Sequence, residues 1–428
     1  MNILLTGANG FIGRYLLAAL LAAGHRVIPA VRRPLETDAL LPEPASIAAD
    51  FNIDVTPADW LPRLDGIDAV INCAGILQAR GRQSIEAIHM RGPAALASAC
   101  REKGVRRFIQ ISAISAREGA GSAYAATKQA GDDAIAATDL DWVILRPSLI
   151  YAAGAYGGTA LFRAIAALPF RQPLPGQGEQ IFQPIHINDL CQTVLRLLAT
   201  PSIRRTVIDP VGPDILTLRQ ILADLRLWLG YPQARFVRVP MAIVRCAARA
   251  GDVLGGPLNT TALRQIAFGN AGNLDAFVAA SGIQPRPWRE ALRSDPAQTQ
   301  DRWHARLYFT RPLLRLTLAL MWIVSGLLGL SMPTASADAV GSFLGLPLPA
   351  IQALTWSGCF ADIAIGFLVA ARYRPGLLAA AQLTVIAAYT LVLGLAQGSL
   401  WADPLGPLLK NFPIMAAVLV LGAIEADR

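Results

Sequence analysis

Two patterns of hydrophobic and polar positions follow each other along this chain. Up to about Arg315, short apolar runs alternate with amphipathic or polar stretches; beyond it, charged residues nearly vanish until Glu425. Short apolar runs separated by helical stretches are typical of a parallel sheet, and apolar runs of about 20 residues are long enough to cross a bilayer. The pattern therefore predicts an α/β half followed by a membrane half.

A glycine-rich segment follows the first apolar run. Asn2 to Thr6 has the pattern of a strand, Gly7-x-x-Gly10-x-x-Gly13 comes next, and helical periodicity continues from there. In a dinucleotide site the first glycine permits a tight turn, the second lets the backbone approach the pyrophosphate, and the third lets the helix pack closely. The helix N-terminus adds free N–H groups. The cofactor contacts expected here are Gly7, Asn9, Gly10, Phe11, Ile12 and Gly13.

Residues after the next predicted strands bear on the choice of cofactor. Where an NAD enzyme places an acidic residue, this chain has Arg32 and Arg33, and a guanidinium suits a 2′-phosphate. We therefore expect NADP, with NAD less favoured; the alternative is that both arginines only solvate a loop. Asp50 is a candidate for the adenine amino group or an ordinary turn acid. Ala74 and Gly75 end a strand expected to run close beneath the nucleoside.

A tyrosine and a lysine four residues apart open a later predicted helix. Tyr124 and Lys128 share one helical face, and an ammonium beside a phenol lowers the pKa of the phenol by favouring phenolate. The pair predicts that Tyr124 exchanges a proton with a substrate oxygen while hydride moves. Lys128 would lower the pKa of Tyr124 in this way and would also hydrogen-bond to the nicotinamide ribose.

Four segments together resemble an extended or atypical short-chain dehydrogenase/reductase over about residues 1–300. They are residues 6–13 (TGANGFIG), 72–75 (NCAG), the pair at 124 and 128, and 145–151 (LRPSLIY). The resemblance implies an α/β Rossmann fold, a doubly wound parallel sheet with a small substrate lobe. Residues 183–190 and 211–218 are similar to the branch that includes the NADPH-binding accessory subunit of respiratory complex I.

The same resemblance assigns further roles and exposes one departure. It places Pro147 near the nicotinamide. The usual catalytic Ser or Thr of the family falls on Ala113, which leaves Ser112 or Ser115 as substitutes, and Ser112 is the expected third catalytic residue. In the complex I branch the domain can bind its nucleotide as a structural part, so a non-catalytic role stays open.

The two halves define the expected domains. We expect a nucleotide-binding domain over 1–300, with its substrate lobe mainly within 155–300, then a basic linker over 301–312 and an all-α four-helix transmembrane bundle over 313–428. The expected spans are residues 313–332, 350–371, 377–397 and 408–424. This tail resembles the DoxX-like membrane family, some members of which are linked to quinone-dependent oxidation.

Basic residues at the ends of the spans predict their orientation. They precede the first span and lie between the second and third, at Arg302, Arg306, Arg311, Arg315, Arg372 and Arg374. The positive-inside rule then puts the first domain and the C-terminus in the cytosol of a bacterial-type inner membrane. No secretory signal is recognised at the N-terminus. Asp362, inside a span, is expected to be functional or a structural polar contact.

Net charge and cysteine spacing exclude other classes. The net charge of +8 comes from scattered arginines without a groove-reading module, so nucleic-acid binding is not expected. Five separated cysteines without C-x-x-C spacing indicate neither disulfides nor a metal site.

The combined interpretation is a membrane-anchored NAD(P)H-dependent oxidoreductase for a carbonyl, quinone or lipid-like substrate. Its expected partners are an apolar small molecule, the lipid bilayer, and a membrane protein or a second copy of the chain. Two alternatives remain: a nucleotide-sugar epimerase or dehydratase, and a non-catalytic NADPH-binding assembly or sensor subunit.

Overall fold

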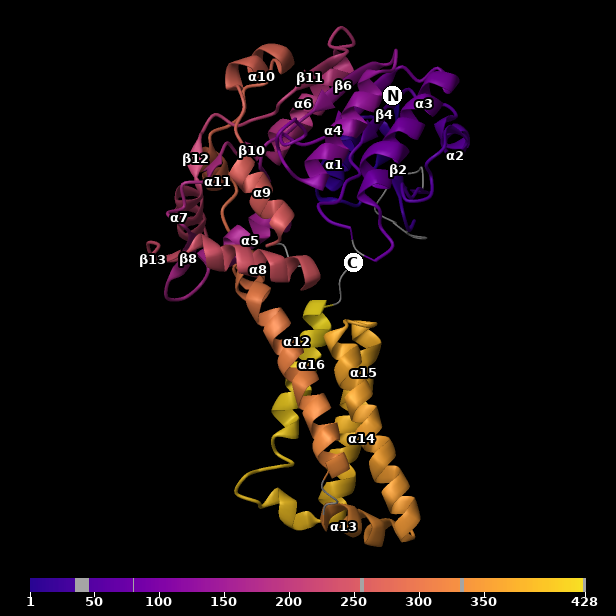
Figure 1. Cartoon of the computed structure of the whole chain (residues 1–428), viewed down its shortest axis with the longest axis vertical. Coiled ribbons are helices and arrows are strands. Elements are labelled where there is room, and N and C mark those ends of the chain that lie inside the picture. Colours follow the sequence, from indigo (N-terminus) through magenta and orange to yellow (C-terminus); the bar gives the residue numbers. More distant parts are fainter. Residues whose placement is uncertain (35–45, 80, 255–257, 332–334, 426–428) are drawn as a thin grey trace. The chain divides into compact units, whose positions relative to one another are not determined.

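The chain forms two compact units, Met1–Ala305 and Arg306–Arg428. The computed structural model describes residues 1–34, 46–79, 81–254, 258–331 and 335–425. Each unit is described by itself below, and Figure 1 labels the helices and strands of both.

The first unit is built on a seven-stranded parallel sheet in the order β11-β6-β5-β4-β1-β2-β3. This is a doubly wound order with one strand added beyond β6, so the Rossmann sheet expected from the sequence is confirmed. The strands are β1 (Asn2–Thr6), β2 (Arg26–Val31), β3 (Ile47–Ala48), β4 (Ala69–Asn72), β5 (Arg107–Ile111), β6 (Asp141–Leu145) and β11 (Thr206–Ile208).

Helices cover both faces of this sheet, and alternate strand residues point into two separate cores. Ile3 and Leu5 pack with α1 and α6, whereas Leu4 between them packs in a second core with residues of α2, α3 and α4. This alternation is the period of two that a strand imposes. The covering elements are α1 (Phe11–Ala22), α2 (Pro57–Trp60), the 3-10 helix η1 (Leu61–Leu64), the π-helix η2 (Ala87–Arg91), α3 (Gly92–Lys103), α4 (Ala123–Ala136) and α6 (Ile187–Ala199).

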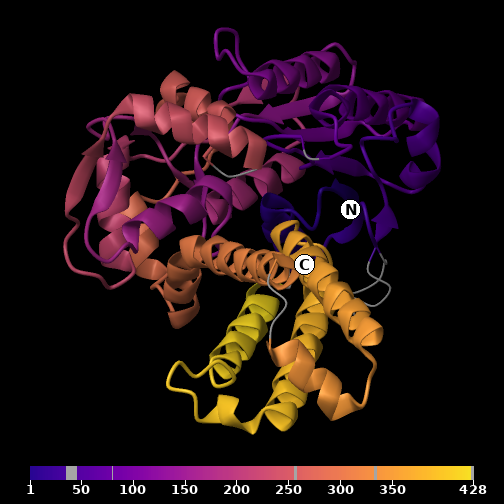
Figure 2. The ribbon, with the colours of Figure 1, turned by 60° about the horizontal axis from the view of Figure 1, so that its bottom comes forward.

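A smaller lobe lies beside the sheet, as Figure 2 shows for the magenta to rose segments. Its core includes Phe162, Phe182 and Trp288. The strands of the lobe are β7 (Ile150–Tyr151), β8 (Gln172–Pro175), β9 (Ile181–Phe182), β10 (Ile185–His186), β12 (Leu216–Thr217) and β13 (Phe236–Val239). Its helices are α5 (Gly157–Ala166), α7 (Leu218–Trp228), α8 (Met241–Leu254), α9 (Thr260–Phe268), α10 (Leu274–Ser281) and α11 (Trp288–Ser294).

The second unit is helical, and three helices are long and apolar enough to cross a membrane within the described residues. They are α12 (Thr299–Ser331), α14 (Leu348–Ala370) and α15 (Pro375–Ala396). The fourth expected span corresponds to α16 (Asn411–Glu425), an apolar helix of 15 residues. At 1.5 Å per residue it measures about 22 Å, less than the hydrocarbon core of about 30 Å. The remaining elements are α13 (Ala335–Leu344) and the 3-10 helix η3 (Gly398–Trp401).

The expected basic linker, residues 301–312, is helical. These residues lie inside α12, which runs without a break and contains Pro312. The arginines of this stretch, together with Ala305 and Leu307, favour a helix.

One close helix contact yields a testable prediction about stability. A Cβ added at Gly131 of α4 would lie 1.9 Å from the backbone oxygen of His89 in η2. We expect Gly131→Ala to force α4 and η2 apart and to destabilise the first unit by about 1–3 kcal/mol. Thermal unfolding of the detergent-purified chain measures this as a lower midpoint of the first transition.

Gly158→Ala is the matched control, because a Cβ there meets no atom within 4 Å. If the unfolding midpoint of Gly131→Ala equalled that of the control, the close contact between α4 and the His89 oxygen would be contradicted.

Candidate functional site

The glycine turn between β1 and α1 is a backbone cradle. Gly7 has a φ of +66° and donates its N–H to the Ala30 oxygen at 3.1 Å. A Cβ at Gly7 would lie 2.9 Å from the Ala74 nitrogen, and one at Gly13 would lie 2.2 Å from the Gly7 oxygen. Side chains at both positions are therefore excluded, and the start of α1 keeps free N–H groups that suit a pyrophosphate.

The remaining residues expected at this turn lie at the same helix start. Asn9 precedes the cap Gly10, and Phe11 and Ile12 form the first turn of α1. The Phe11 ring stacks on the ring of Tyr156, with centroids 5.3 Å apart. The loop before α5 thus reaches the turn, a contact that the sequence pattern did not predict.

A buried chain of side-chain hydrogen bonds holds the neighbouring strand ends in register. The Thr6 hydroxyl donates to Asn72 Oδ1 at 2.5 Å, and Asn72 Nδ2 donates to Gln110 Oε1 at 2.8 Å. Asn72 Oδ1 also accepts from the Ala74 N–H at 3.0 Å. These bonds link β1, β4 and β5 at their carboxyl ends and place Ala74 and Gly75 beside the glycine turn.

The residues expected around the adenosine lie at the ends of β2 and β3. Arg32 and Arg33 follow β2 directly and are exposed. Asp50 follows β3, and its Oδ1 accepts hydrogen bonds from the backbone and side-chain nitrogens of Asn52. Asp50 therefore closes a turn, which is the alternative that the sequence left open for it.

Helix α4 carries the expected catalytic pair to the same edge of the sheet. The helix is capped by the Ser122 hydroxyl, which accepts from the Ala125 N–H. Lys128 is 4% exposed, and its ammonium donates to the Ile111 oxygen at 3.2 Å and to the Ala74 oxygen at 3.5 Å. A Cβ at Gly75 would lie 3.0 Å from Lys128 Nζ. The Lys128 ammonium therefore packs directly against the backbone at Gly75, which follows β4.

The electrostatics of the pair differ from the expectation. Burial raises the pKa of Tyr124 to about 12, and the Asp132 carboxylate adds to the rise. Burial lowers the pKa of Lys128, while Asp132 raises it. The pKa of Tyr124 is therefore raised, and not lowered as the sequence predicted, because burial disfavours the charged phenolate.

Ser112 belongs to a buried cluster around Asp132, which lies one turn beyond Lys128 on α4. Its hydroxyl donates to Asp132 Oδ2 at 2.8 Å, and the same oxygen accepts from Arg146 Nε at 2.9 Å. Asp132 Oδ1 is buried and has no hydrogen-bond partner among the residues that the structure describes. Burial raises the pKa of Asp132, and its bonds to Arg146 and Ser112 oppose that rise. Ser112 is therefore tied to a carboxylate instead of pointing freely beside Tyr124.

His89 in η2 is a site residue that the sequence analysis missed. Its ring lies edge-on to the Tyr124 ring with centroids 5.2 Å apart. His89 Nε2 accepts from the Ile76 N–H at 3.1 Å, so Nδ1 carries the proton and donates to the Thr127 hydroxyl at 3.0 Å. Burial, with Lys128 as the second cause, lowers the pKa of His89 to about 3. A lone histidine gives no sequence signal, whereas Asp132 could have been found at the i+4 spacing from Lys128.

The segment after β6 completes this edge. Pro147 is buried, and its oxygen accepts from the Ile114 N–H at 3.0 Å. Within the segment 183–190, His186 and Asp189 are occupied by contacts inside the unit: His186 Nε2 lies 3.3 Å from Asp295 Oδ2, and Asp189 Oδ1 lies 2.9 Å from Arg286 Nε.

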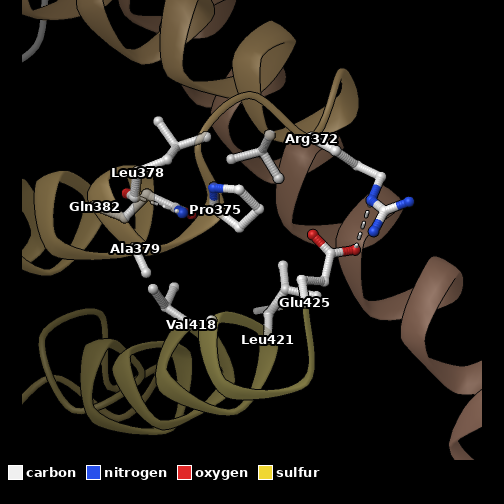
Figure 3. Close-up of a pocket in the computed structure, with 10 residues that line it drawn as sticks. Arg372, Pro375, Leu378, Ala379, Gln382, Val418, Leu421 and Glu425 are labelled. Atoms are coloured by element: carbon white, nitrogen blue, oxygen red, sulfur yellow. Dashed lines mark hydrogen bonds and ion pairs between the residues drawn. The ribbon is translucent and has the colours of Figure 1, made fainter. Parts of the chain in front are cut away.

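Polar side chains inside the second unit are paired with each other. Asp362 Oδ1 accepts from the Tyr389 hydroxyl at 3.2 Å, which is the structural polar contact left open for it. Glu425 Oε1 lies 2.7 Å from Arg315 Nη1 and 3.9 Å from Arg372 Nε, and Figure 3 shows Glu425 and Arg372 at the cavity between α14, α15 and α16. That cavity measures about 10 Å³, room for one water at most.

Comparison with known proteins places both units. Residues 3–207 match the model of the NAD dependent epimerase/dehydratase family, and residues 319–419 match that of the DoxX-like family. The chain is 31% identical over 262 residues to the ceramide reductase of Caulobacter vibrioides, covering 60% of this chain and 79% of that protein.

Two further proteins are similar at lower identity. The mitochondrial NADH dehydrogenase (ubiquinone) 1 alpha subcomplex subunit 9 of Arabidopsis thaliana is 26% identical over 258 residues, covering 58% of this chain and 62% of the subunit. The solved structure of MoeE5 in complex with UDP-glucose and NAD has a TM-score of 0.53 at 21% identity, covering 72% of this chain and all of that one. The chain therefore belongs to the NAD dependent epimerase/dehydratase family and carries a DoxX-like membrane domain behind its Rossmann unit.

Proposed function

We propose that the protein is a membrane-anchored NAD(P)H-dependent oxidoreductase that reduces a carbonyl group of a lipid-like substrate. The observation that carries this proposal is the position of α4. It brings Tyr124 and Lys128 to the carboxyl edge of the sheet, where Lys128 contacts the ends of β4 and β5 beside the glycine turn. Ligands of open parallel sheets bind at this edge.

The residues of the edge fit a nicotinamide dinucleotide. Gly7 and Gly13 allow a tight turn in which a Cβ would collide with neighbouring backbone, and the free N–H groups at the start of α1 suit a pyrophosphate. When bound, the reduced cofactor supplies the hydride for the carbonyl carbon. Exposed Arg32 and Arg33, next to the end of β2, favour a 2′-phosphate and hence NADP over NAD.

The chain's own residues then have separate tasks. Tyr124 donates its phenolic proton to the carbonyl oxygen of the substrate, and its hydroxyl becomes phenolate in that step. Lys128 holds two of its protons on the Ile111 and Ala74 oxygens and directs the third to the ribose hydroxyls. His89, neutral and fixed in one tautomer, packs against the Tyr124 ring and keeps its position.

Two observations favour a lipid-like substrate. The relative from Caulobacter vibrioides is named a ceramide reductase, and a ceramide is a lipid. In addition, α12, α14 and α15 tie this chain to a bilayer, which raises the effective concentration of membrane-dissolved substrates at the site. The arginines near the ends of these helices favour a cytosolic position for the Rossmann unit in a bacterial-type inner membrane.

One observation favours a second function, that of a non-catalytic nucleotide-binding subunit. Ala113 occupies the position of the usual catalytic hydroxyl, and Ser112 donates to Asp132. The Arabidopsis relative is a subunit of NADH dehydrogenase. This second function predicts cofactor binding without turnover.

The cofactor preference gives the first prediction of this proposal. We expect the double variant Arg32→Ala/Arg33→Ala to bind NADPH at least about tenfold more weakly, about 1.4 kcal/mol, because two charge-assisted contacts to the 2′-phosphate are lost. Binding of NADH should stay within about twofold. Fluorescence titration of the detergent-purified chain measures both. Arg26→Ala, an exposed arginine at the start of β2, is the control, and equal losses for both cofactors would contradict the assignment.

The proton donor gives the second prediction. Tyr124→Phe keeps the ring that packs on His89 and removes the hydroxyl, so kcat for reduction of a long-chain carbonyl substrate should fall by about 10²–10⁴. The Kd for NADPH should change by less than about threefold, because the phenol lies apart from the pyrophosphate cradle. Tyr373→Phe, at an exposed tyrosine of the second unit, is the control. If Tyr124→Phe turned over substrate at the wild-type rate, Tyr124 would be excluded as the proton donor. If neither the wild-type protein nor Tyr373→Phe turned over substrate, the second function would be favoured.

The pH dependence gives the third prediction. Because the pKa of Tyr124 is raised to about 12, the phenol stays protonated from pH 6 to 10 and can donate its proton throughout that range. Deprotonation of Tyr124 should therefore not lower the rate of reduction between pH 6 and 10. The reverse oxidation needs the phenolate, so its rate should rise about tenfold per pH unit. Initial rates in both directions test this, and an oxidation rate that levels off near pH 7 would contradict the raised pKa.

A further inference from the structure

Helix α8 of the lobe presents apolar side chains to solvent. Ile243 is 58% exposed and Val253 is 86% exposed, and Cys246 is exposed as well. At 100° per residue, these three residues and the exposed Ala247 and Ala250 fall on one continuous arc of about 120° around the helix. We call these five residues the apolar arc of α8.

The opposite face of α8 is firmly packed. Val244 and Ala248 are buried, and a Cβ at Gly251 would lie 1.8 Å from the Leu258 oxygen just before α9. The apolar arc is therefore the outer face of an anchored helix. In a soluble protein such an arc normally faces a core, so its exposure calls for a partner.

Two hydrogen bonds tie the α8–α9 pair to the rim of the candidate site. Gln78 Nε2 donates to Asp252 Oδ1 at 3.1 Å, and Arg264 Nη1 donates to the Gly121 oxygen at 2.9 Å. Gln78 lies in the loop that follows Ala74 and Gly75, and Gly121 immediately precedes the cap of the helix that carries Tyr124. The α8–α9 pair therefore borders this rim, and the apolar arc lies on the side of α8 that faces away from Asp252.

The charges around the arc identify the partner. Arg245 and Arg249 are exposed and lie along one flank of the arc. The acidic residue of the α8 sequence, Asp252, is occupied by Gln78 and by the Thr260 N–H. An apolar face flanked by arginines is the pattern of a helix that lies in the boundary between lipid headgroups and acyl chains. The arginines match anionic headgroups.

We propose that α8 is an interfacial membrane helix that docks the lobe on an anionic lipid surface. The chain meets such a surface wherever α12, α14 and α15 span a bilayer. Ile243, Cys246 and Val253 enter the headgroup–acyl boundary, and Arg245 and Arg249 contact lipid phosphates. Helix α8, which borders the rim formed by Gln78 and Gly121, then holds the Tyr124 site close to the leaflet in which a substrate with a long apolar chain is dissolved. This last consequence rests on the proposed function, whereas the membrane contact does not.

The native Cys246 makes the test direct. Of the five cysteines it is the exposed one, whereas Cys100, Cys191 and Cys359 are buried and Cys73 is partly buried. The full-length protein is placed in nanodiscs of phosphatidylglycerol and phosphatidylcholine, and a nitroxide label is attached to Cys246. Collision with oxygen, which concentrates in lipid, is compared with collision with a water-soluble nickel chelate. Labelled Cys246→Ser protein gives the background from the other cysteines.

We expect the ratio of oxygen to nickel collisions at Cys246 to exceed that of the control by at least about threefold in the anionic nanodiscs, because the label sits at the depth of an interfacial helix. The control label is Glu102→Cys in Cys246→Ser, on an exposed position of α3. The double variant Arg245→Gln/Arg249→Gln should lower the ratio at Cys246, and so should a change to phosphatidylcholine alone.

Two outcomes overturn the proposal. A ratio at Cys246 equal to that of the control would show that α8 faces water, and low collision with both reagents would show that protein covers the arc. Because the collisions need no turnover, the measurement is repeated in Tyr124→Phe. A membrane-embedded label in both proteins, together with a wild type that reduces no carbonyl substrate, would refute the proposed function alone and leave the docking of α8 intact.

Discussion

Close approach of backbone segments at the carboxyl edge of the parallel sheet is the constraint on which the Rossmann unit depends. The turn after β1 lies so close to the segment after β4 that Gly7 can carry no side chain, and α1 lies so close to the same turn that Gly13 can carry none. The end of β4 in turn meets the Lys128 ammonium at Gly75, and α4 meets η2 at Gly131. Glycine is needed at each contact for a different neighbour. Together these contacts put the phosphate cradle, the lysine and the tyrosine on one edge.

Burial of charge at this edge then decides its chemistry. Two cations, Lys128 and Arg146, lie near one carboxylate, Asp132, and no partner among the described residues reaches its second oxygen. Burial, together with the Asp132 charge, raises the pKa of Tyr124, and burial, together with the Lys128 charge, lowers that of His89. A phenol that stays protonated suits the donation of a proton to a carbonyl oxygen, which is the reductive direction of the proposed reaction. The hydroxyl of Ser112 contributes to holding Asp132.

The membrane unit obeys a different rule, because lipid offers no hydrogen bonds to a stranded polar group. Its internal polar side chains are accordingly joined across helices: Trp322 donates to Gln382 at 2.9 Å, and Asn411 donates to Thr390 at 2.7 Å. The Asp362–Tyr389 and Arg315–Glu425 contacts follow the same rule. These pairs join α12, α14, α15 and α16 to one another. In the proposed function the chemistry belongs to the Rossmann unit, which carries Tyr124 and Lys128, and the helices supply the anchorage.

The sequence by itself determined the class of both units, because strand and helix periodicities, the glycine spacing and the long apolar runs are local properties of the chain. It also located Tyr124 and Lys128, since four residues form one helical turn. Only the tertiary structure brought His89 to the Tyr124 ring, tied Ser112 to Asp132 and turned the apolar arc of α8 outward. Those outcomes depend on contacts between segments far apart in the chain, and on burial, which reversed the expected shift of the tyrosine pKa. The structure also showed that residues 301–312 are helical and that α16 has 15 residues. Composition alone does not specify where a helix begins and ends.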